Sequence, residues 1–69
     1  MAHQITLEQA RMLKKMSRKE AAERIGVSQN TILNWETGKS YPSVFYIPAI
    51  LKTYELQSIN DLLFILPEN

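Results

Sequence analysis

The amino-acid sequence predicts a single small all-α domain made of five short helices. A chain of 69 residues can bury one hydrophobic core, so we expect one domain over residues 1–69. Residues that cap or end helices divide the chain into short segments, within which apolar residues recur every three or four positions. The dividing residues are Thr6, Ser17, Gly26, Gly38, Pro42, Pro48 and Pro67.

The first two helices each begin with a hydroxyl residue that is followed three positions later by Gln or Glu. This is the capping-box pattern, in which two side chains bond the free backbone N–H groups at a helix start. Thr6 and Gln9 open the first helix, which we expect to end near Lys15. Ser17 and Glu20 open the second helix in the same way.

A tight turn is expected between the second and third helices. Gly26 supplies the left-handed backbone conformation that ends a helix, and Ser28 caps the next helix two residues later. The third helix is expected over residues 29 to about 37, where Gly38 ends it. A helix, a short turn and a second helix, here about residues 17–37, form a unit that can place one helix in the DNA major groove.

Two further helices complete the predicted bundle. The fourth is expected to begin near Ser43, with Pro48 tolerated because it lies in or near the first turn. The fifth is expected to begin at Ser58, with Asp61 as its capping partner, and to end before Pro67. Their apolar positions are Ile47, Ile50, Leu51 and Tyr54 in the fourth helix, and Ile59, Leu62, Leu63 and Leu66 in the fifth.

The predicted third helix has an outward face that is short, polar and almost uncharged. At about 100° per residue, Ile32 and Trp35 point to one side. An ordinary solvent-facing helix carries Lys and Glu rather than Gln and Asn, which are weaker helix formers. A carboxamide offers a donor and an acceptor side by side, which matches N7 and N6 of adenine in the major groove. The opposite face therefore favours DNA contact over a merely solvated surface; it consists of Gln29, Asn30, Leu33, Asn34 and Thr37.

Residues 17–42, SRKEAAERIGVSQNTILNWETGKSYP, resemble the core of the phage-repressor and Cro type of the helix-turn-helix family. The resemblance rests on the paired alanines 21–22, on Gly-Val-Ser at 26–28 and on Glu-Thr-Gly-Lys at 36–39. The order and spacing of the predicted helices from residue 7 to 66 are also similar to that family's DNA-binding domain. The resemblance implies a five-helix, lambda-repressor-like fold and a bacterial or phage transcription regulator, with repression as the expected action.

The resemblance also implies roles for individual residues. Arg11 stands where the family usually has an arginine opposite Glu36, so we expect a buried ion pair between the first and third helices. The residues expected to contact bases are Gln29, Asn30, Leu33 and Asn34. The residues expected to contact phosphates are Ser17, Arg18, Ser28, Thr37 and Lys39.

Charge is divided unevenly along the chain. The net charge is +1, but seven basic and four acidic residues up to Lys39 give that part +3, whereas the part from Ser40 onward carries −2. The first part is therefore the better candidate to face phosphate. On charge alone, a solvated helical face would explain the basic residues equally well.

A second hypothesis belongs to a different class of function. A small protein-interaction module, such as an antirepressor that keeps this fold, would bind a partner regulator instead of DNA. The modest net charge and the apolar Leu33 on the outward face are compatible with it, since Leu33 can meet either a thymine methyl or a protein. Salt separates the two hypotheses, because DNA binding weakens steeply with added salt and apolar protein docking does not.

Other classes of function are disfavoured by composition. The absence of cysteine excludes a zinc finger and a disulfide framework, and the lone His3 suggests no metal ion and no cofactor. No catalytic constellation is present, so we do not expect an enzyme. The longest apolar run, residues 62–66, is too short to cross a membrane, so we expect a cytoplasmic protein. Five aromatic residues are expected in the core rather than on a base-stacking surface: Trp35, Phe45, Tyr46, Tyr54 and Phe64.

The apolar run at residues 62–66 suggests a homodimer. One buried helix face cannot cover all five side chains, so Phe64 or Ile65 could pair across a two-fold axis. In such a dimer, the third helix of one copy would lie about 34 Å from that of the other, which would match successive major grooves. The expected partner is therefore double-stranded DNA with a two-fold symmetric operator.

Overall fold

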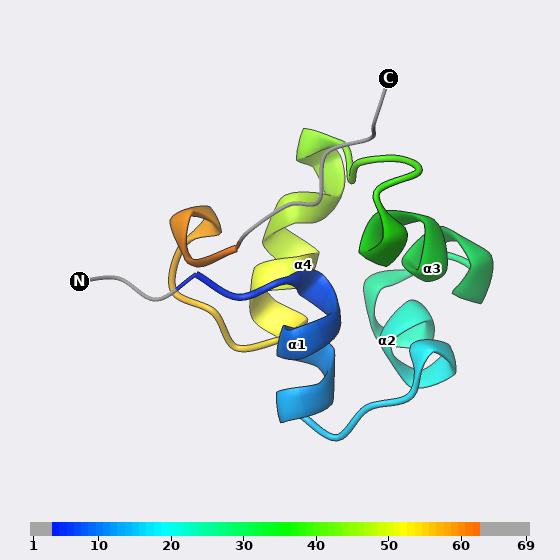
Figure 1. Cartoon of the computed structure of the whole chain (residues 1–69), viewed down its shortest axis with the longest axis horizontal. Helices are drawn as coiled ribbons and strands as arrows, with labels where there is room; N and C mark the ends of the chain where they lie inside the picture. Colours follow the sequence, from blue (N-terminus) through cyan, green and yellow to red (C-terminus); the bar gives the residue numbers. More distant parts are fainter. Residues whose placement is uncertain (1–3, 63–69) are drawn as a thin grey trace.

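The computed structural model describes residues 4–62 and shows an all-α fold, as the sequence predicts. Figure 1 shows α3 on one side of the molecule next to α2, with the described N-terminal end and η2 on the opposite side. The elements are α1 (Leu7–Leu13), α2 (Arg18–Ile25), α3 (Gln29–Thr37), η1 (Val44–Tyr46), α4 (Ile47–Thr53) and η2 (Ile59–Asp61).

The capping box at the start of α1 is confirmed, whereas the one at α2 is only half formed. The backbone N–H of Gln9 donates to Thr6 Oγ1 at 3.1 Å, and the Thr6 N–H donates to Gln9 Oε1 at 2.9 Å. At α2, the N–H of Glu20 donates to Ser17 Oγ, but the Glu20 carboxylate pairs with Arg24 one turn later. A nearby cation competes successfully for that carboxylate, and the serine alone caps the helix.

Both predicted glycine stops are present. Gly26 has φ +94° and Gly38 has φ +82°, and each ends its helix in the left-handed conformation. A Cβ added to Gly26 would meet no atom within 4 Å, so glycine is favoured there by the backbone angle and not by crowding. Ser28 follows and accepts the N–H of Thr31, so α3 begins after a connection of three residues, 26–28. The turn between the two helices is therefore set by local chemistry.

The core lies among the four α-helices. α3 packs on α2 and α1, and α4 packs on α2, so α3 is held from its inner side. Ile32 of α3 and Ile50 of α4 are essentially fully buried. The buried hydrophobic residues are Leu7, Ala10, Met16, Ala21, Ala22, Ile25, Ile32, Trp35, Ile50, Tyr54 and Leu62.

The predicted fifth helix is wrong over its described part. Only the short η2 forms after Ser58, whose side chain caps Asn60 rather than the expected Asp61. Leu62 is already extended, with φ −100° and ψ 135°, and forms a parallel bridge with Ile5. Pairing with a segment remote in sequence has overridden the helical spacing of the apolar residues. The rest of the predicted helix, residues 63–66, lies outside the described residues.

The other predicted boundaries shift by one or two residues. α1 ends at Leu13, and Lys15 has a positive φ of 56° in the turn that follows. The fourth helical segment begins after Ser43 as the 3-10 helix η1, and α4 proper follows with Pro48 in its first turn. Of the apolar positions predicted for the fourth helix, Ile50 and Tyr54 are buried in the core, and Ile47 and Leu51 are partly buried against it.

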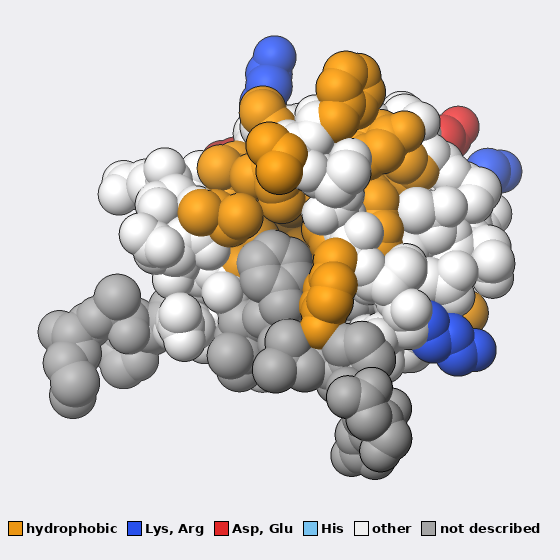
Figure 2. All heavy atoms as spheres, turned by 90° about the horizontal axis from the view of Figure 1, so that it is seen from above, with side chains coloured by type: hydrophobic (Ala, Val, Ile, Leu, Met, Phe, Trp, Pro, Cys, Tyr) orange, Lys and Arg blue, Asp and Glu red, His pale blue; other side chains and the backbone are white. Residues whose placement is uncertain are grey.

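The prediction that the aromatic residues are buried is wrong for Phe45, whose exposed fraction is 82%. Trp35 and Tyr54 are buried as expected, and the Trp35 and Tyr46 rings lie 5.7 Å apart. Phe45 belongs to η1, a single short turn, so an apolar residue there need not face the core. Figure 2 shows hydrophobic side chains gathered on the face seen from above, at the end of the molecule that carries η1 and the start of α4. Phe64 lies outside the described residues.

None of the helices found in residues 4–62 has the length and apolar character needed to cross a membrane. The same residues contain no group of three or more His, Cys, Asp or Glu that could hold a metal ion. His3 lies outside the described residues.

Candidate nucleic-acid interface

The two sides of α3 have different surroundings. On its inner side, Ile32 and Trp35 are buried against the other helices. On its outer side, Gln29 and Asn30 are exposed, and Leu33 and Asn34 are half-buried. The structure therefore brings the four predicted base-contacting residues to one accessible surface of one anchored helix.

The amide side chains on this surface are not used within the fold. Among residues 4–62, the carboxamides of Gln29, Asn30 and Asn34 form no hydrogen bond. Each therefore keeps its donors and its acceptor available to a ligand. A rigid helix that presents three such amides can make paired donor and acceptor contacts with base edges in the major groove.

The predicted phosphate-contacting hydroxyls lie at the ends of α2 and α3, and they differ in what they can still donate. Ser17 Oγ only accepts a bond, from the N–H of Glu20 at 3.0 Å, so its own proton remains free for a phosphate oxygen. Ser28 Oγ accepts from the Thr31 N–H and also shares a 2.9 Å bond with the Thr31 hydroxyl. Thr37 donates its single hydroxyl proton to Leu33 O at 2.8 Å, so it has none left to donate. Ser17 is thus the best donor of the three.

The two cations predicted to meet phosphate are placed differently. Lys39 is exposed just after α3 and forms no ion pair within residues 4–62. Arg18, the first residue of α2, points toward α1 and α3 and pairs with Glu36 and Glu8. Of these two cations, Lys39 can contact a phosphate without breaking an ion pair within residues 4–62, whereas Arg18 cannot.

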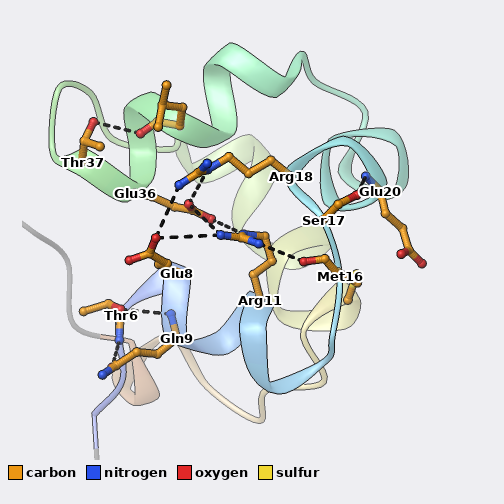
Figure 3. A network of polar contacts seen from close by, with 11 residues as sticks. Thr6, Glu8, Gln9, Arg11, Met16, Ser17, Arg18, Glu20, Glu36 and Thr37 are labelled. Carbon is orange, nitrogen blue, oxygen red and sulfur yellow. Dashed lines mark hydrogen bonds and ion pairs between the residues drawn. The ribbon is translucent and has the colours of Figure 1, made fainter.

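The structure brings Arg11 and Glu36 together as an ion pair between α1 and α3 (Figure 3). Arg11 Nε donates to Glu36 Oε2 at 2.7 Å, and Nη2 donates to Oε1 at 3.3 Å. Arg11 also donates to the backbone oxygen of Met16 at 2.8 Å, which fixes the turn after α1. The Glu36 side chain is only 2% exposed, and its hydrogen bond raises the pKa of Arg11 above the ordinary value. This pair holds the end of α3 at a defined position on α1.

Two further residues complete this network, and the sequence analysis missed their role in it. Arg18 Nε donates to Glu36 Oε1 at 2.9 Å, so the carboxylate serves two arginines from two helices. Glu8 Oε2 lies 3.4 Å from Arg18 Nη2 and 3.9 Å from Arg11 Nη2. The three-residue spacing of Glu8 and Arg11 was the available signal for one of these contacts. No local pattern could have indicated that Arg18 reaches Glu36, because the two are 18 positions apart.

Tyr54 of the loop after α4 lies within electrostatic reach of the same pair. Its side chain is buried, and this loss of hydration, together with the negative charge of Glu36, raises the pKa of Tyr54 to about 12. Arg11 acts in the opposite direction but is the weakest of the three influences. The phenol is therefore neutral over the whole physiological range.

Comparison with known proteins places this architecture in a family. A family model described as helix-turn-helix matches residues 7–62, which include α1 to α4 and η2. The chain is 35% identical over 57 residues to the HTH-type transcriptional activator BcrR of Enterococcus faecalis. That match covers 83% of this chain but only 28% of the relative. No solved structure matches significantly. Because the family model covers most of the chain and includes the α2-turn-α3 unit, the chain belongs to the helix-turn-helix family of the phage-repressor and Cro type.

Proposed function

We propose that this chain binds double-stranded DNA in a sequence-specific manner, with α3 in the major groove, and thereby regulates transcription. The observation that carries the proposal is the outer surface of α3. Three carboxamides without intramolecular hydrogen bonds stand on a helix whose other side is buried and tied to α1 by an ion pair. Membership of the helix-turn-helix family supports this orientation, since the second helix of the unit is the one that enters the groove.

Base contacts and phosphate contacts are made by different residues in this proposal. Gln29, Asn30 and Asn34 contact base edges and prefer positions with A·T pairs, and Leu33 packs on a thymine methyl. Ser17 and Lys39 contact phosphates on either side of the groove, together with Ser28, and these contacts carry no direct sequence information. Thr37 contributes at most as an acceptor, because its proton is committed to Leu33 O.

We further propose that two copies bind a two-fold symmetric operator. One α3 covers only part of a turn of major groove, and a dimer doubles the length of the site that is read. Within the apolar run at residues 62–66, Phe64 or Ile65 is the residue that we propose for the contact between copies. Sedimentation that shows a monomer at high concentration, together with one chain bound per palindromic site, would exclude this arrangement.

The direction of regulation is a separate proposal. The family resemblance in the sequence favours repression, and we propose a repressor that blocks a promoter by occupying its operator. The relative BcrR is named as an activator, so activation is the competing outcome. A reporter gene placed behind the selected operator distinguishes the two, because expression falls in one case and rises in the other.

A selection from random duplex DNA, followed by binding measurements on the selected site, tests the function. We expect an enriched sequence with A·T positions and a steep fall in affinity as salt rises, since phosphate contacts release counterions. Failure to enrich any sequence, together with weak binding that is insensitive to salt, would contradict the proposal. Such a result would favour the partner-binding alternative, which the half-buried Leu33 on the outer side of α3 keeps open.

A further inference from the structure

Glu8 occupies a position in the polar network that the proposed function does not explain. It is an acidic side chain, 50% exposed, on the first turn of α1. Figure 3 shows it beside Arg18 and Arg11, the two arginines that also pair with Glu36. The four side chains Glu8, Arg11, Arg18 and Glu36 carry two positive and two negative charges, so the network is electrically balanced.

Arg18 is held differently at the two ends of its guanidinium group. Its Nε donates to Glu36 at 2.9 Å, and the Glu36 side chain is 2% exposed. Its Nη2 reaches Glu8 at 3.4 Å, which is longer than the 2.7–2.9 Å or so typical of a charge-assisted hydrogen bond. This second contact lies between two partly exposed side chains, where an ion pair contributes little and is easily replaced. The Nη end can therefore change its partner while Nε stays on Glu36.

We propose that Glu8 competes with a DNA phosphate for Arg18 and thereby limits the affinity of this domain for DNA. The proposal rests on the proposed DNA-binding function and names a residue that restrains it. A phosphate oxygen and a carboxylate oxygen suit the same guanidinium fork, so either can occupy the Nη side of Arg18. The two anions repel each other at this range, so a phosphate that binds Arg18 displaces Glu8 or is weakened by it.

Replacement of the acid by its neutral isostere tests this competition. In Glu8→Gln, Arg18 keeps its bond to Glu36 and gains freedom to contact phosphate. We expect Kd on the selected operator to fall about three- to tenfold near 0.1 M salt, and the salt slope to steepen by about one. Circular dichroism and a thermal melt establish that the variant is folded, as expected for a change at a half-exposed position.

The matched control is Glu55→Gln. Glu55 is also an exposed acid in an ion pair, with Lys14 at 3.3 Å, but it follows α4 and is not part of the network around Arg18. The Glu55→Gln substitution removes the same charge as Glu8→Gln but frees Lys14 instead of Arg18, so it measures the general effect of net charge on DNA binding. Equal affinities and equal salt slopes for Glu8→Gln and Glu55→Gln would overturn the proposal.

A double-mutant cycle identifies the cation involved. In an Arg18→Gln background, the guanidinium that Glu8→Gln would free is absent. We therefore expect Glu8→Gln to tighten DNA binding there no more than Glu55→Gln does. The same tightening with and without Arg18 would show that Glu8 acts through the general field, which contradicts the proposal. If the parent chain enriches no DNA sequence, both the function and this inference fail. If the parent binds its operator and the Glu8 effect is absent, only the inference fails.

Discussion

Both sides of α3 carry polar groups, but Glu36 on the inner side has partners within the described fold, whereas the amides on the outer side have none. The inner side buries Ile32 and Trp35 and adds a charged residue, Glu36, whose carboxylate is fully engaged by arginines. The outer side exposes neutral amides that are engaged by nothing within the described residues. Polar groups on the inner side set the position of the helix, and polar groups on the outer side are left free for a ligand. The accessible amides of α3 therefore stand on a helix whose inner side is held in place by a charge network.

Anchoring a helix through a buried carboxylate costs desolvation free energy, but it fixes the orientation of the helix. Desolvation of two or more charges offsets much of their attraction, so an apolar replacement could be as stable. Apolar contacts are less directional, however, whereas the Arg11 fork fixes Glu36 at two atoms at once. We therefore expect variants on the inner side to change stability first, and variants on the outer side to change DNA binding alone.

The largest expected effect is on stability, from Glu36→Gln. This change leaves the buried Arg11 without its main counter-ion and should lower the free energy of unfolding by about 3–5 kcal/mol. Arg11→Met should cost less, because Arg18 still compensates the carboxylate. Urea denaturation measures both. Values within about 0.5 kcal/mol of the parent would contradict the structural role of the pair.

Glu20→Gln is the matched control for that experiment. Glu20 also pairs with an arginine, Arg24, at 2.9 Å, but both side chains are about half exposed. Removal of this exposed pair should cost no more than about 1 kcal/mol. A control as destabilised as Glu36→Gln would show that burial of the pair is not what matters.

Helix starts and ends in the first half of the chain could be predicted because their causes are local. The capping of α1 by Thr6 and the left-handed stops at Gly26 and Gly38 depend on residues within four positions of each other. The region after Ser58 could not be predicted in this way. There Leu62 pairs with Ile5 across most of the chain length, and an apolar periodicity does not reveal that contact.

The candidate site shows the same division. The outward position of Gln29, Asn30 and Asn34 follows from helical geometry once α3 is placed, so the sequence was sufficient for it. The placement of Arg18 was not foreseen, because a side chain of that length can turn outward to phosphate or inward to Glu36. The choice depends on where α1 puts Glu8, which is a tertiary property.

On the outer side, Asn34→Ala and Gln29→Ala should weaken DNA binding without unfolding the domain. Loss of a paired contact with a base should cost about 1–3 kcal/mol on the preferred operator and relax the preference at one or two base pairs. Binding to non-specific DNA should stay nearly unchanged. Competition titrations on the operator and on scrambled duplexes measure this ratio, and an equal loss on both would show that these amides do not select bases.

A smaller effect on stability is expected at high pH from Tyr54, which lies close to the Arg11–Glu36 pair. Its pKa is about 12 in the folded chain against an ordinary value of 10.0, so the neutral phenol favours the folded state. This contribution is complete below pH 10 and is lost as pH rises from 10 toward 12, by about 1 kcal/mol at pH 11. Tyr54→Phe lacks the titration, so its stability should fall less between pH 9 and 11. Parallel pH profiles for the two proteins would contradict the burial of the phenol beside Glu36.

The smallest expected effect concerns Lys39, which extends the outer side by a single exposed charge. Because it has no ion pair within residues 4–62, it can contact a phosphate without breaking an internal contact, in contrast to Arg18. Lys39→Ala should therefore weaken binding about threefold on operator and scrambled DNA alike, and reduce the salt slope by about one. Lys52→Ala removes another exposed cation, from the last turn of α4 rather than from beside α3, and should leave the slope unchanged. Equal slopes for both variants would mean that net charge, and not the position of Lys39 beside α3, accounts for its effect on DNA binding.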